Sequence, residues 1–223
     1  MIRVAVETAT GMGTVAVARG DRVLAEIALG DQSRHSESVL PALETALSIA
    51  GLERSRIDEV VVGGGPGSFT GVRVAAATTK GLVAVLERPL LAYSSLLALA
   101  AGVPWDGPVC ALFDARRGEV YAGCWAVGRD GVDTVLSPLA GLVESVVEAT
   151  APASPLFVGD GALRYRDVLL SAGVAPGRVA LVPTHPRASV LLWLAEHHRS
   201  GAVVADVPGW EPTYVRGSSA RKS

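Results

Sequence analysis

Three consecutive β-strand patterns at the start of the chain constrain its fold more than any other feature. Residues 2–7, 13–19 and 22–29 are short runs rich in valine and alanine, and glycines at positions 11, 13 and 20 supply turn residues between them. Because these connections are so short, neighbouring strands must run antiparallel. The sequence therefore predicts an antiparallel meander of three strands.

A helix, a strand and a second helix are predicted after the meander. Apolar residues recur at spacings of three and four between residues 33 and 50, and Gly51 marks the end of this helix. Pro41 implies that the helix starts late or bends. A continuous apolar strand pattern begins at Asp58, and residues 69–86 form the second helix pattern. The order in the first half is thus βββαβα.

The second half repeats this order more loosely. A strand pattern ends at Tyr93, a short helix follows from Ser94, and two further strand patterns flank a hairpin turn at residues 116–118. A third strand at 132–136, a helix and a strand at 155–159 follow. Further helices come after them, and one of these contains Trp193. A strand is also expected near Val182.

A repeated meander followed by alternating helices and strands predicts an α/β protein of two ribonuclease-H-like lobes. This is the architecture of the actin, Hsp70 and sugar-kinase (ASKHA) group. We expect the first lobe at residues 1–103, the second at 104–216 and a disordered tail at 217–223.

Composition limits the classes of partner and the compartment. The net charge of −2 gives the molecule as a whole no electrostatic attraction to nucleic acid or acidic membrane. Arg3 and Glu7 interrupt the only N-terminal apolar run, and no stretch approaches the about 18 apolar residues of a membrane span. We expect a cytoplasmic protein. Cys110 and Cys124 lack a CxxC spacing and are expected to lie opposite one another across the 116–118 hairpin as buried thiols.

The most glycine-rich segment, GGGPGSFTG at residues 63–71, resembles a phosphate-binding loop only at first sight. No glycine pair has the spacing of a P-loop followed by lysine, and Thr70 stands where the dinucleotide fingerprint requires glycine. The nucleophile elbow Gly-x-Ser-x-Gly also fails around Ser68. A strand-to-helix corner remains, formed by Gly65, Pro66, Gly67, Ser68, Thr70 and Gly71, in which Ser68 is the expected N-cap and Phe69 an anchor.

Two hairpins are candidates for contact with a nucleotide. In the predicted architecture the first hairpin, at residues 7–11, faces the phosphates of a bound nucleotide. The hairpin at residues 113–119 has the corresponding position in the second lobe. Turn residues that satisfy their own backbone are the alternative for the first hairpin, and an exposed charged tip is the alternative for the second. The nucleotide-facing candidates are Glu7, Thr8, Thr10, Asp114, Arg116 and Arg117.

The four histidines do not form a metal-binding pattern. Neither HExxH nor a His-x-x-x-His pair is present, because Val39 stands four residues after His35. We therefore expect no metal site, and a peptidase activity has no nucleophile or metal spacing to support it.

The predicted helix at residues 69–86 is small or apolar nearly all the way round. Such a helix must be covered on every side. It lies either inside the core of this chain or with one face against a partner, and composition alone leaves both open.

The chain resembles the TsaB family, formerly YeaZ, in five segments that occur in the family's order. They extend from SRHSESVLP and GGGPGSFTGVRVAAATTKGLV through FDARRGEVY and VGDGA to EPTYVR, and the resemblance covers nearly the whole chain. The glycine segment followed by R-x-x-x-x-T-K-G is the most specific of them.

The resemblance implies two actin-like lobes, the second reduced, and no catalysis by the chain alone. TsaB proteins pair with TsaD, a metal-holding paralogue that transfers threonylcarbamoyl to N6 of the adenosine 3′-adjacent to the anticodon in tRNA. The ATPase TsaE joins them. The two helices of the first lobe pack against TsaD or a second TsaB copy. This implies interface positions at His35, Ser36, Leu40, Leu43, Leu47, Phe69, Arg73, Ala76, Ala77 and Lys80.

The chain departs from the family at the end of its first strand. Family members usually carry aspartate there, whereas this chain has Glu7. The resemblance predicts an activating subunit that needs no cofactor of its own and reaches tRNA through the complex. It leaves open whether ATP or ADP binds where the subunits meet. The alternative is a stand-alone ATPase or kinase of the same fold.

Overall fold

The computed structural model describes residues 1–182 and 184–215, and the backbone alone at Ser33. The predicted tail at 217–223 lies outside the described residues. The chain forms two compact units, of which the first contains Met1–Ala98 and Pro186–Thr213 and the second contains Leu99–His185. Residues 186–213, which the sequence analysis assigned to the second lobe, therefore return to the first unit.

The first unit is built on a five-stranded sheet that contains the predicted meander. The strand order is β3-β2-β1-β4-β5. Strands β1, β2 and β3 pair antiparallel, whereas β4 runs parallel to β1 and β5 parallel to β4. The strands span Ile2–Glu7 (β1), Gly13–Arg19 (β2), Arg22–Leu29 (β3), Glu59–Gly63 (β4) and Leu90–Tyr93 (β5).

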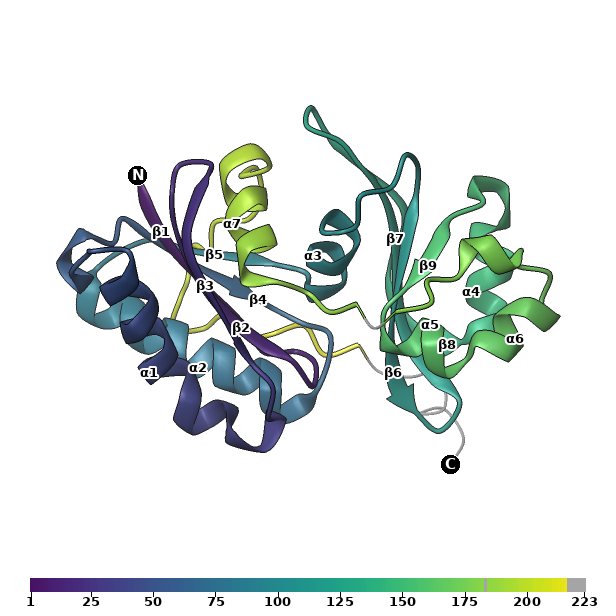
Figure 1. Cartoon of the computed structure of the whole chain (residues 1–223), viewed down its shortest axis with the longest axis horizontal. Coiled ribbons are helices and arrows are strands. Elements are labelled where there is room, and N and C mark those ends of the chain that lie inside the picture. The colour runs from purple at the N-terminus through teal and green to yellow at the C-terminus, as the bar shows by residue number, and fades with distance from the viewer. Residues whose placement is uncertain (183, 216–223) are drawn as a thin grey trace. The chain divides into compact units, whose positions relative to one another are not determined.

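Helices cover both faces of this sheet (Figure 1). The long helices α1, His35–Ile49, and α2, Phe69–Leu86, lie side by side on one face, and α7, Ala188–His197, lies on the other. Helix α1 begins at His35 and contains Pro41, so of the two alternatives, a late start or a bend, the late start does not occur. The core between sheet and helices consists of valines, leucines and alanines from β1, β2, β4, α1 and α2. The shorter elements are 3-10 turns at Gln32–Arg34 and Arg54–Arg56, and helix α3 at Ser95–Ala101.

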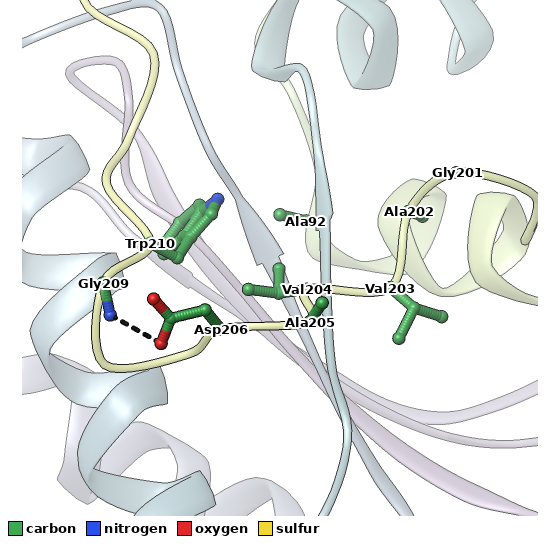
Figure 2. A pocket seen from close by; sticks show the side chains of 9 residues that line it. All are labelled: Ala92, Gly201, Ala202, Val203, Val204, Ala205, Asp206, Gly209 and Trp210. Atoms are coloured by element: carbon green, nitrogen blue, oxygen red, sulfur yellow. Dashed lines mark hydrogen bonds between the residues drawn. The ribbon is translucent and has the colours of Figure 1, made fainter.

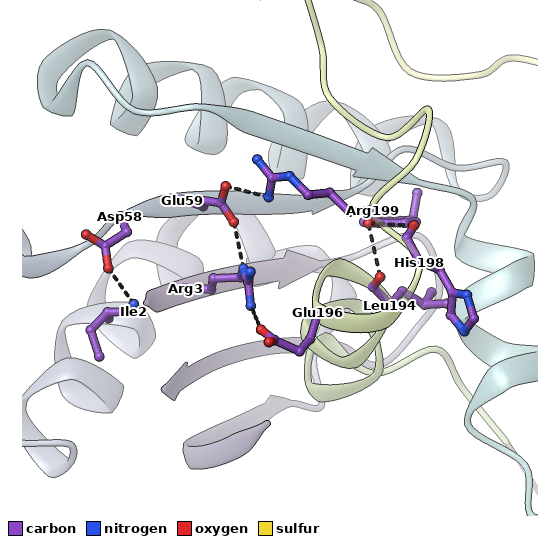
Figure 3. A network of polar contacts seen from close by, with 9 residues as sticks. Ile2, Arg3, Asp58, Glu59, Leu194, Glu196, His198 and Arg199 are labelled. Atoms are coloured by element: carbon purple, nitrogen blue, oxygen red, sulfur yellow. Dashed lines mark hydrogen bonds and ion pairs between the residues drawn. The ribbon is translucent and has the colours of Figure 1, made fainter. Parts of the chain in front are cut away.

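A buried ion network explains why α7 returns to the first sheet (Figure 3). Arg3 on β1 and Glu59 on β4 are 6% and 3% exposed and pair at 2.6 Å between Nε and Oε2. Arg3 also pairs with Glu196 on α7, and Arg199 pairs with Glu59 at 2.5 Å. Buried charges must be paired to be tolerated. Glu196 on α7 and Arg199 just after it add a second partner to each member of this pair and so tie α7 to the sheet.

The segment after α7 extends the first sheet beyond β5. The Ala92 amide donates to Ala202 O and the Val204 amide to Leu90 O, each at 2.9 Å. A pocket of about 370 Å³ lies beside this added segment. Figure 2 shows the residues that line it, among them Val204, Asp206 and Trp210. The sequence analysis did not anticipate this segment.

The second unit contains a smaller sheet with the same opening order. Its strands are β6 Val109–Arg116, β7 Glu119–Val127, β8 Val132–Leu142 and β9 Leu156–Val158, in the order β8-β7-β6-β9. Strand β9 runs parallel to β6, and the others pair antiparallel. The helices are α4 Val143–Thr150, α5 Asp160–Arg164 and α6 Arg166–Ser171, with 3-10 turns at Ala151–Ala153 and Pro176–Arg178.

Two predictions for the second unit have different outcomes. Cys110 and Cys124 face each other in the β6–β7 register and are buried, as expected, and burial raises the pKa of the Cys110 thiol. The expected strand near Val182 is wrong, because Leu181 and Val182 form a bend and Val179 makes an isolated bridge to Phe157.

Candidate functional site

The glycine corner between β4 and α2 packs directly on the turn that follows β1. A Cβ at Gly67 would lie 2.4 Å from the Ala9 carbonyl oxygen, and one at Gly71 would lie 1.9 Å from the Thr8 carbonyl oxygen. The Ser68 amide donates to the Ala9 carbonyl oxygen at 2.7 Å. Glycine permits this approach because it lacks the atom that would clash. The start of α2 is therefore held against the backbone of the turn after β1.

The remaining residues of the corner fix the start of α2. Ser68 is the N-cap, as predicted, and its hydroxyl accepts from the Gly71 amide at 3.4 Å. Gly65 has a φ of +85°, a conformation that favours glycine, and its amide donates to the Ser95 hydroxyl at 3.2 Å. Pro66 is buried and Thr70 is exposed.

Glu7 lies fully buried beneath this corner. Its carboxylate accepts from the Ala9 amide at 2.7 Å and from the Ser95 hydroxyl at 2.8 Å. Burial raises the pKa of Glu7 to about 7, although these hydrogen bonds lower it. A Cβ at Gly63 would lie 1.8 Å from Glu7 Oε2, so a larger residue on the neighbouring strand would displace this carboxylate. Ser95, which bridges Glu7 to Gly65, is a residue that sequence reasoning missed, since the serine pair at 94–95 suggested only a helix cap.

The other two nucleotide-facing candidates of the first unit, Thr8 and Thr10, also form hydrogen bonds within that unit. Thr8 is buried, and its hydroxyl donates to the Gly71 carbonyl oxygen at 2.7 Å. Thr10 is half-buried, and its hydroxyl donates to the Met12 carbonyl oxygen at 3.1 Å. Of Glu7, Thr8 and Thr10, only Thr10 is partly exposed.

In the second unit the candidates lie at the tip of the β6–β7 hairpin. Arg116 and Arg117 are exposed and have φ values of 69° and 54°. Asp114 accepts from the Tyr165 hydroxyl at 3.0 Å and pairs with Arg164 at 3.3 Å. The carboxylate therefore serves the packing of α5 on the sheet, and the two arginines face solvent.

Helix α1 divides the predicted interface residues between core and surface. His35 is 1% exposed, with Nε2 at 3.3 Å from the Leu29 carbonyl oxygen, and Leu43 and Leu47 are also buried. The resemblance implied an interface role for these three, but the structure places them in the core of the unit. Ser36 is exposed, and Leu40 keeps 47% of its surface exposed.

Helix α2 is divided in the same way. Ala76, for which the resemblance implied an interface position, is buried within the unit, whereas Ala77 and Arg73 are exposed. The Phe69 ring is 57% exposed, and the Arg73 guanidinium lies over it with Cζ at 3.8 Å from the ring centroid. Lys80 turns back onto its own unit and donates to the Pro208 carbonyl oxygen at 2.9 Å.

An open groove of about 420 Å³ lies on this outer face. Its lining combines apolar walls, three hydroxyl groups and one guanidinium, supplied by Ser36, Phe69, Thr70, Arg73, Val74, Ala77 and Thr78. We call the exposed side of α1 and α2 around this groove the outer face. It is defined by Ser36, Leu40, Phe69, Arg73 and Ala77.

Helix α2 is strongly apolar, in agreement with the sequence pattern of residues 69–86. Its 18 residues have a mean hydropathy of 1.3, enough by length and composition to cross a membrane, yet only 33% of them are buried in the unit. The criterion is weak, because core helices have the same composition. The prediction that no stretch approaches this length is nevertheless wrong.

Among residues 1–182 and 184–215, no group of three or more His, Cys, Asp and Glu side chains could hold a metal ion.

The architecture defines the class of protein. Each unit opens with antiparallel strands and then adds a parallel strand beside the first, and a glycine corner comes after that strand. This is the two-lobed ribonuclease-H-like arrangement of the ASKHA group.

Comparison with known proteins identifies the family within this class. A family model described as "TsaD: tRNA N6-adenosine threonylcarbamoyltransferase" matches residues 22–161. The tRNA threonylcarbamoyladenosine biosynthesis protein TsaB of Bacillus subtilis is 32% identical, over 97% of this chain and 94% of its own length. Escherichia coli TsaB is also 32% identical, over 98% and 96%. The solved structure of YeaZ from Pseudomonas aeruginosa is 29% identical with a TM-score of 0.79, and the match covers 96% and 99% of the two chains. The chain belongs to the TsaB family.

Proposed function

We propose that this chain is a non-catalytic, activating subunit in the biosynthesis of threonylcarbamoyladenosine in tRNA. It pairs with TsaD through its outer face, and TsaE joins the complex. TsaD transfers threonylcarbamoyl to N6 of the adenosine 3′-adjacent to the anticodon. The chain works in the cytoplasm, needs no cofactor of its own, and meets tRNA through the complex. The place for ATP or ADP is the interface between the subunits.

The single observation that supports this proposal most is the incomplete burial of α2. A helix with a mean hydropathy of 1.3 that is only 33% buried exposes apolar surface to water. Phe69 at the start of α2 contributes to this surface with an exposed fraction of 57%, and Leu40 on the neighbouring helix α1 enlarges it with an exposed fraction of 47%. Contiguous exposed apolar surface is typical of a protein interface.

The position of Glu7 supports a subunit role over a stand-alone ATPase or kinase. An enzyme of this fold needs its first acidic side chain near the metal and phosphates. Here the carboxylate is 0% exposed and is turned onto Ala9 and Ser95. ATP turnover by the isolated chain, abolished in Glu7→Ala, would restore the enzyme alternative.

The test is complex formation with TsaD and the modification that depends on it. Wild-type chain and TsaD are expected to co-elute as a heterodimer on sizing, and tRNA modification by TsaD and TsaE is expected to require the chain. Ala77→Glu places a charge on the outer face and is expected to abolish pairing, because an unpaired charge in a packed interface costs several kcal/mol. Modification that proceeds equally well without the chain would refute the proposal.

The choice of Ala77 rests on its exposure. Ala77 is exposed, so the substitution leaves the core intact, whereas Ala76 is buried and a charge there would disturb the fold itself. Ala172→Glu, at an exposed alanine of the second unit, is the matched control and is expected to pair like the wild type. Thermal melting of all three proteins checks that each is folded.

A further inference from the structure

The β6–β7 hairpin of the second unit ends in three residues with an unusual backbone conformation. Arg116, Arg117 and Gly118 have φ values of 69°, 54° and 84°. Arg116 is paired with Glu119 in the strand register, and the two residues between them form the loop of the hairpin. Two-residue loops with positive φ at both positions favour Asn-Gly or Gly-Gly. The two arginines therefore stand where glycine or asparagine would be less strained.

The fold itself makes no use of these two side chains. Arg116 and Arg117 are exposed, and within residues 1–182 and 184–215 neither guanidinium forms an ion pair or a hydrogen bond. The space around the tip is open, since a Cβ at Gly118 would meet no atom within 4 Å. Strained backbone is typical of functional positions, where the side chain has a role that glycine cannot supply. The two charges are accessible to a ligand from outside the chain.

The acidic side chains near the tip have other partners. Asp114 accepts from the Tyr165 hydroxyl at 3.0 Å and pairs with Arg164 at 3.3 Å. Asp160 accepts from two backbone amides, and Glu119 is half-buried in β7. These three carboxylates balance Arg164 and the two arginines of the tip in charge. The tip therefore attracts an anion by direct contact and not over a long range.

The shape and composition of the tip indicate the kind of anion. A mononucleotide needs a concave pocket that buries most of its surface, whereas this tip is a hairpin turn of exposed residues. A protein partner needs apolar contact at the core of its interface, and Arg116, Arg117 and Gly118 offer no apolar side chain. A phosphodiester backbone needs neither, because its contacts are polar and are made at the surface. Each guanidinium can donate two parallel hydrogen bonds to one phosphate.

We propose that Arg116 and Arg117 bind the phosphate backbone of tRNA, so that this chain contacts the RNA directly through its second unit. The inference rests on the proposed function, because tRNA is the substrate of the complex in which the chain takes part. The contact positions the RNA without reading its sequence, since phosphates are the same at every nucleotide. It gives the second unit a role of its own beside the pairing of the outer face with TsaD.

The experiment measures how tightly the complex of this chain with TsaD binds an unmodified tRNA transcript, between about 50 and 200 mM sodium chloride. Arg116→Gly combined with Arg117→Asn removes both charges and introduces residues that the turn favours. We expect this double variant to bind tRNA about tenfold or more weakly at low salt. The slope of the logarithm of the binding constant against the logarithm of the salt concentration should become shallower by about 1 to 2.

Stability and two further variants separate binding from folding. Because glycine and asparagine relieve the strain, urea unfolding of the double variant should show a stability equal to or above that of the wild type. Arg129→Asn is the matched control, because Arg129 is an exposed arginine in the β7–β8 connection of the same unit and has no positive φ. It is expected to bind tRNA like the wild type. Arg116→Lys combined with Arg117→Lys keeps the charges and should keep most of the salt dependence.

The possible results distinguish this inference from the proposed function. Failure of the wild-type chain to pair with TsaD would overturn the proposed function. If the wild-type complex forms and modifies tRNA, equal tRNA binding by the double variant would overturn the inference alone, as would an equal loss in Arg129→Asn. A double variant that binds tRNA normally but loses TsaD or TsaE would make an acidic protein surface the ligand. One that loses only ATP or ADP would make the ligand a nucleotide, and either result would overturn the inference.

Discussion

Each unit of the molecule has a glycine corner that connects a parallel strand to a helix, but the two helices differ. In the first unit β4 leads through Gly67 into α2, and a Cβ at Gly71 would lie 1.9 Å from the Thr8 carbonyl oxygen after β1. In the second unit β9 leads through Gly159 into α5, and a Cβ at Gly159 would lie 2.2 Å from the Leu112 carbonyl oxygen on β6. The first corner packs the start of its helix against the turn after the first strand of its sheet, and the second packs its helix start against the middle of the first strand.

The corners differ in the helix that each of them begins. Helix α2 has 18 residues and exposes a long apolar side, whereas α5 has five residues. In the first unit the buried acid at the end of the strand is Glu7, and in the second the corresponding Asp114 is only half-buried. The comparison indicates that the same corner serves packing in both units, and that the length of the helix behind it determines whether an interaction surface results.

The largest expected effect is that of Gly71→Ala. The new Cβ would meet the backbone of Thr8, which cannot turn aside as a flexible side chain could, so we expect a loss of about 3 kcal/mol or more in the free energy of unfolding. Urea unfolding at neutral pH measures it. Gly81→Ala, in the same helix with open space around it, is the control and should stabilise the protein by about 0.5–1 kcal/mol. Equal stability of Gly71→Ala and wild type would refute the close contact.

A pH dependence of similar size is expected from Glu7. Its pKa is raised from 4.5 to about 7 by burial, so between these values the folded chain holds a proton that the unfolded chain has released. The contribution of Glu7 to stability is therefore complete below pH 4.5 and is lost as the pH rises through 7, a change of about 3 kcal/mol. Unfolding measured from pH 4.5 to 8 should show this fall in the wild type and a smaller one in Glu7→Gln. Parallel curves for the two proteins would contradict it.

A smaller effect is expected at the second corner from Gly161→Ala. Its Cβ would lie 3.0 Å from the Leu112 backbone, a tight contact that a small shift relieves. We expect a loss of about 1 kcal/mol, measured in the same urea experiment. A loss as large as that of Gly71→Ala would show that the two corners are equally rigid.

The smallest effect is expected from Ser68→Ala. The hydroxyl that caps α2 accepts from the Gly71 amide at a long 3.4 Å, so its removal should cost about 0.5 kcal/mol, at the low end for N-caps. Thermal melting of the variant beside the wild type measures this. A loss above about 2 kcal/mol, beyond the usual range for an N-cap, would contradict the weak cap inferred from this long hydrogen bond.

Much of the local structure could be predicted from the sequence. The meander, both long helices, the β6–β7 hairpin with Cys110 opposite Cys124, and the cap at Ser68 follow from turn residues and from periodicities of 2 and 3.6, which are local properties. The failure of each phosphate motif at the glycine segment also needed only spacing. These inferences required no knowledge of which segments meet.

The candidate site was less predictable, because α2 is apolar on nearly every side. No amphipathic stripe indicated that Ala76 faces the sheet and Ala77 the solvent. The resemblance implied an interface position for His35, yet its ring lies buried against Gly13 and the Leu29 carbonyl oxygen. Glu7 resembled a phosphate-facing acid, and Ser95, 88 residues later, turned out to be its partner.

The sequence by itself determined the order of the elements, the glycine corner, the family resemblance and the lack of paired metal-binding histidines along the full sequence. The tertiary structure alone decided that α7 returns to the first sheet, that Glu7 is buried and that Arg73 lines a groove with Phe69. The physical reason is the range of the interactions. Hydrogen-bonded turns and side-chain periodicity depend on residues a few positions apart, whereas burial depends on segments as distant as Arg3 and Glu196, which are 193 positions apart.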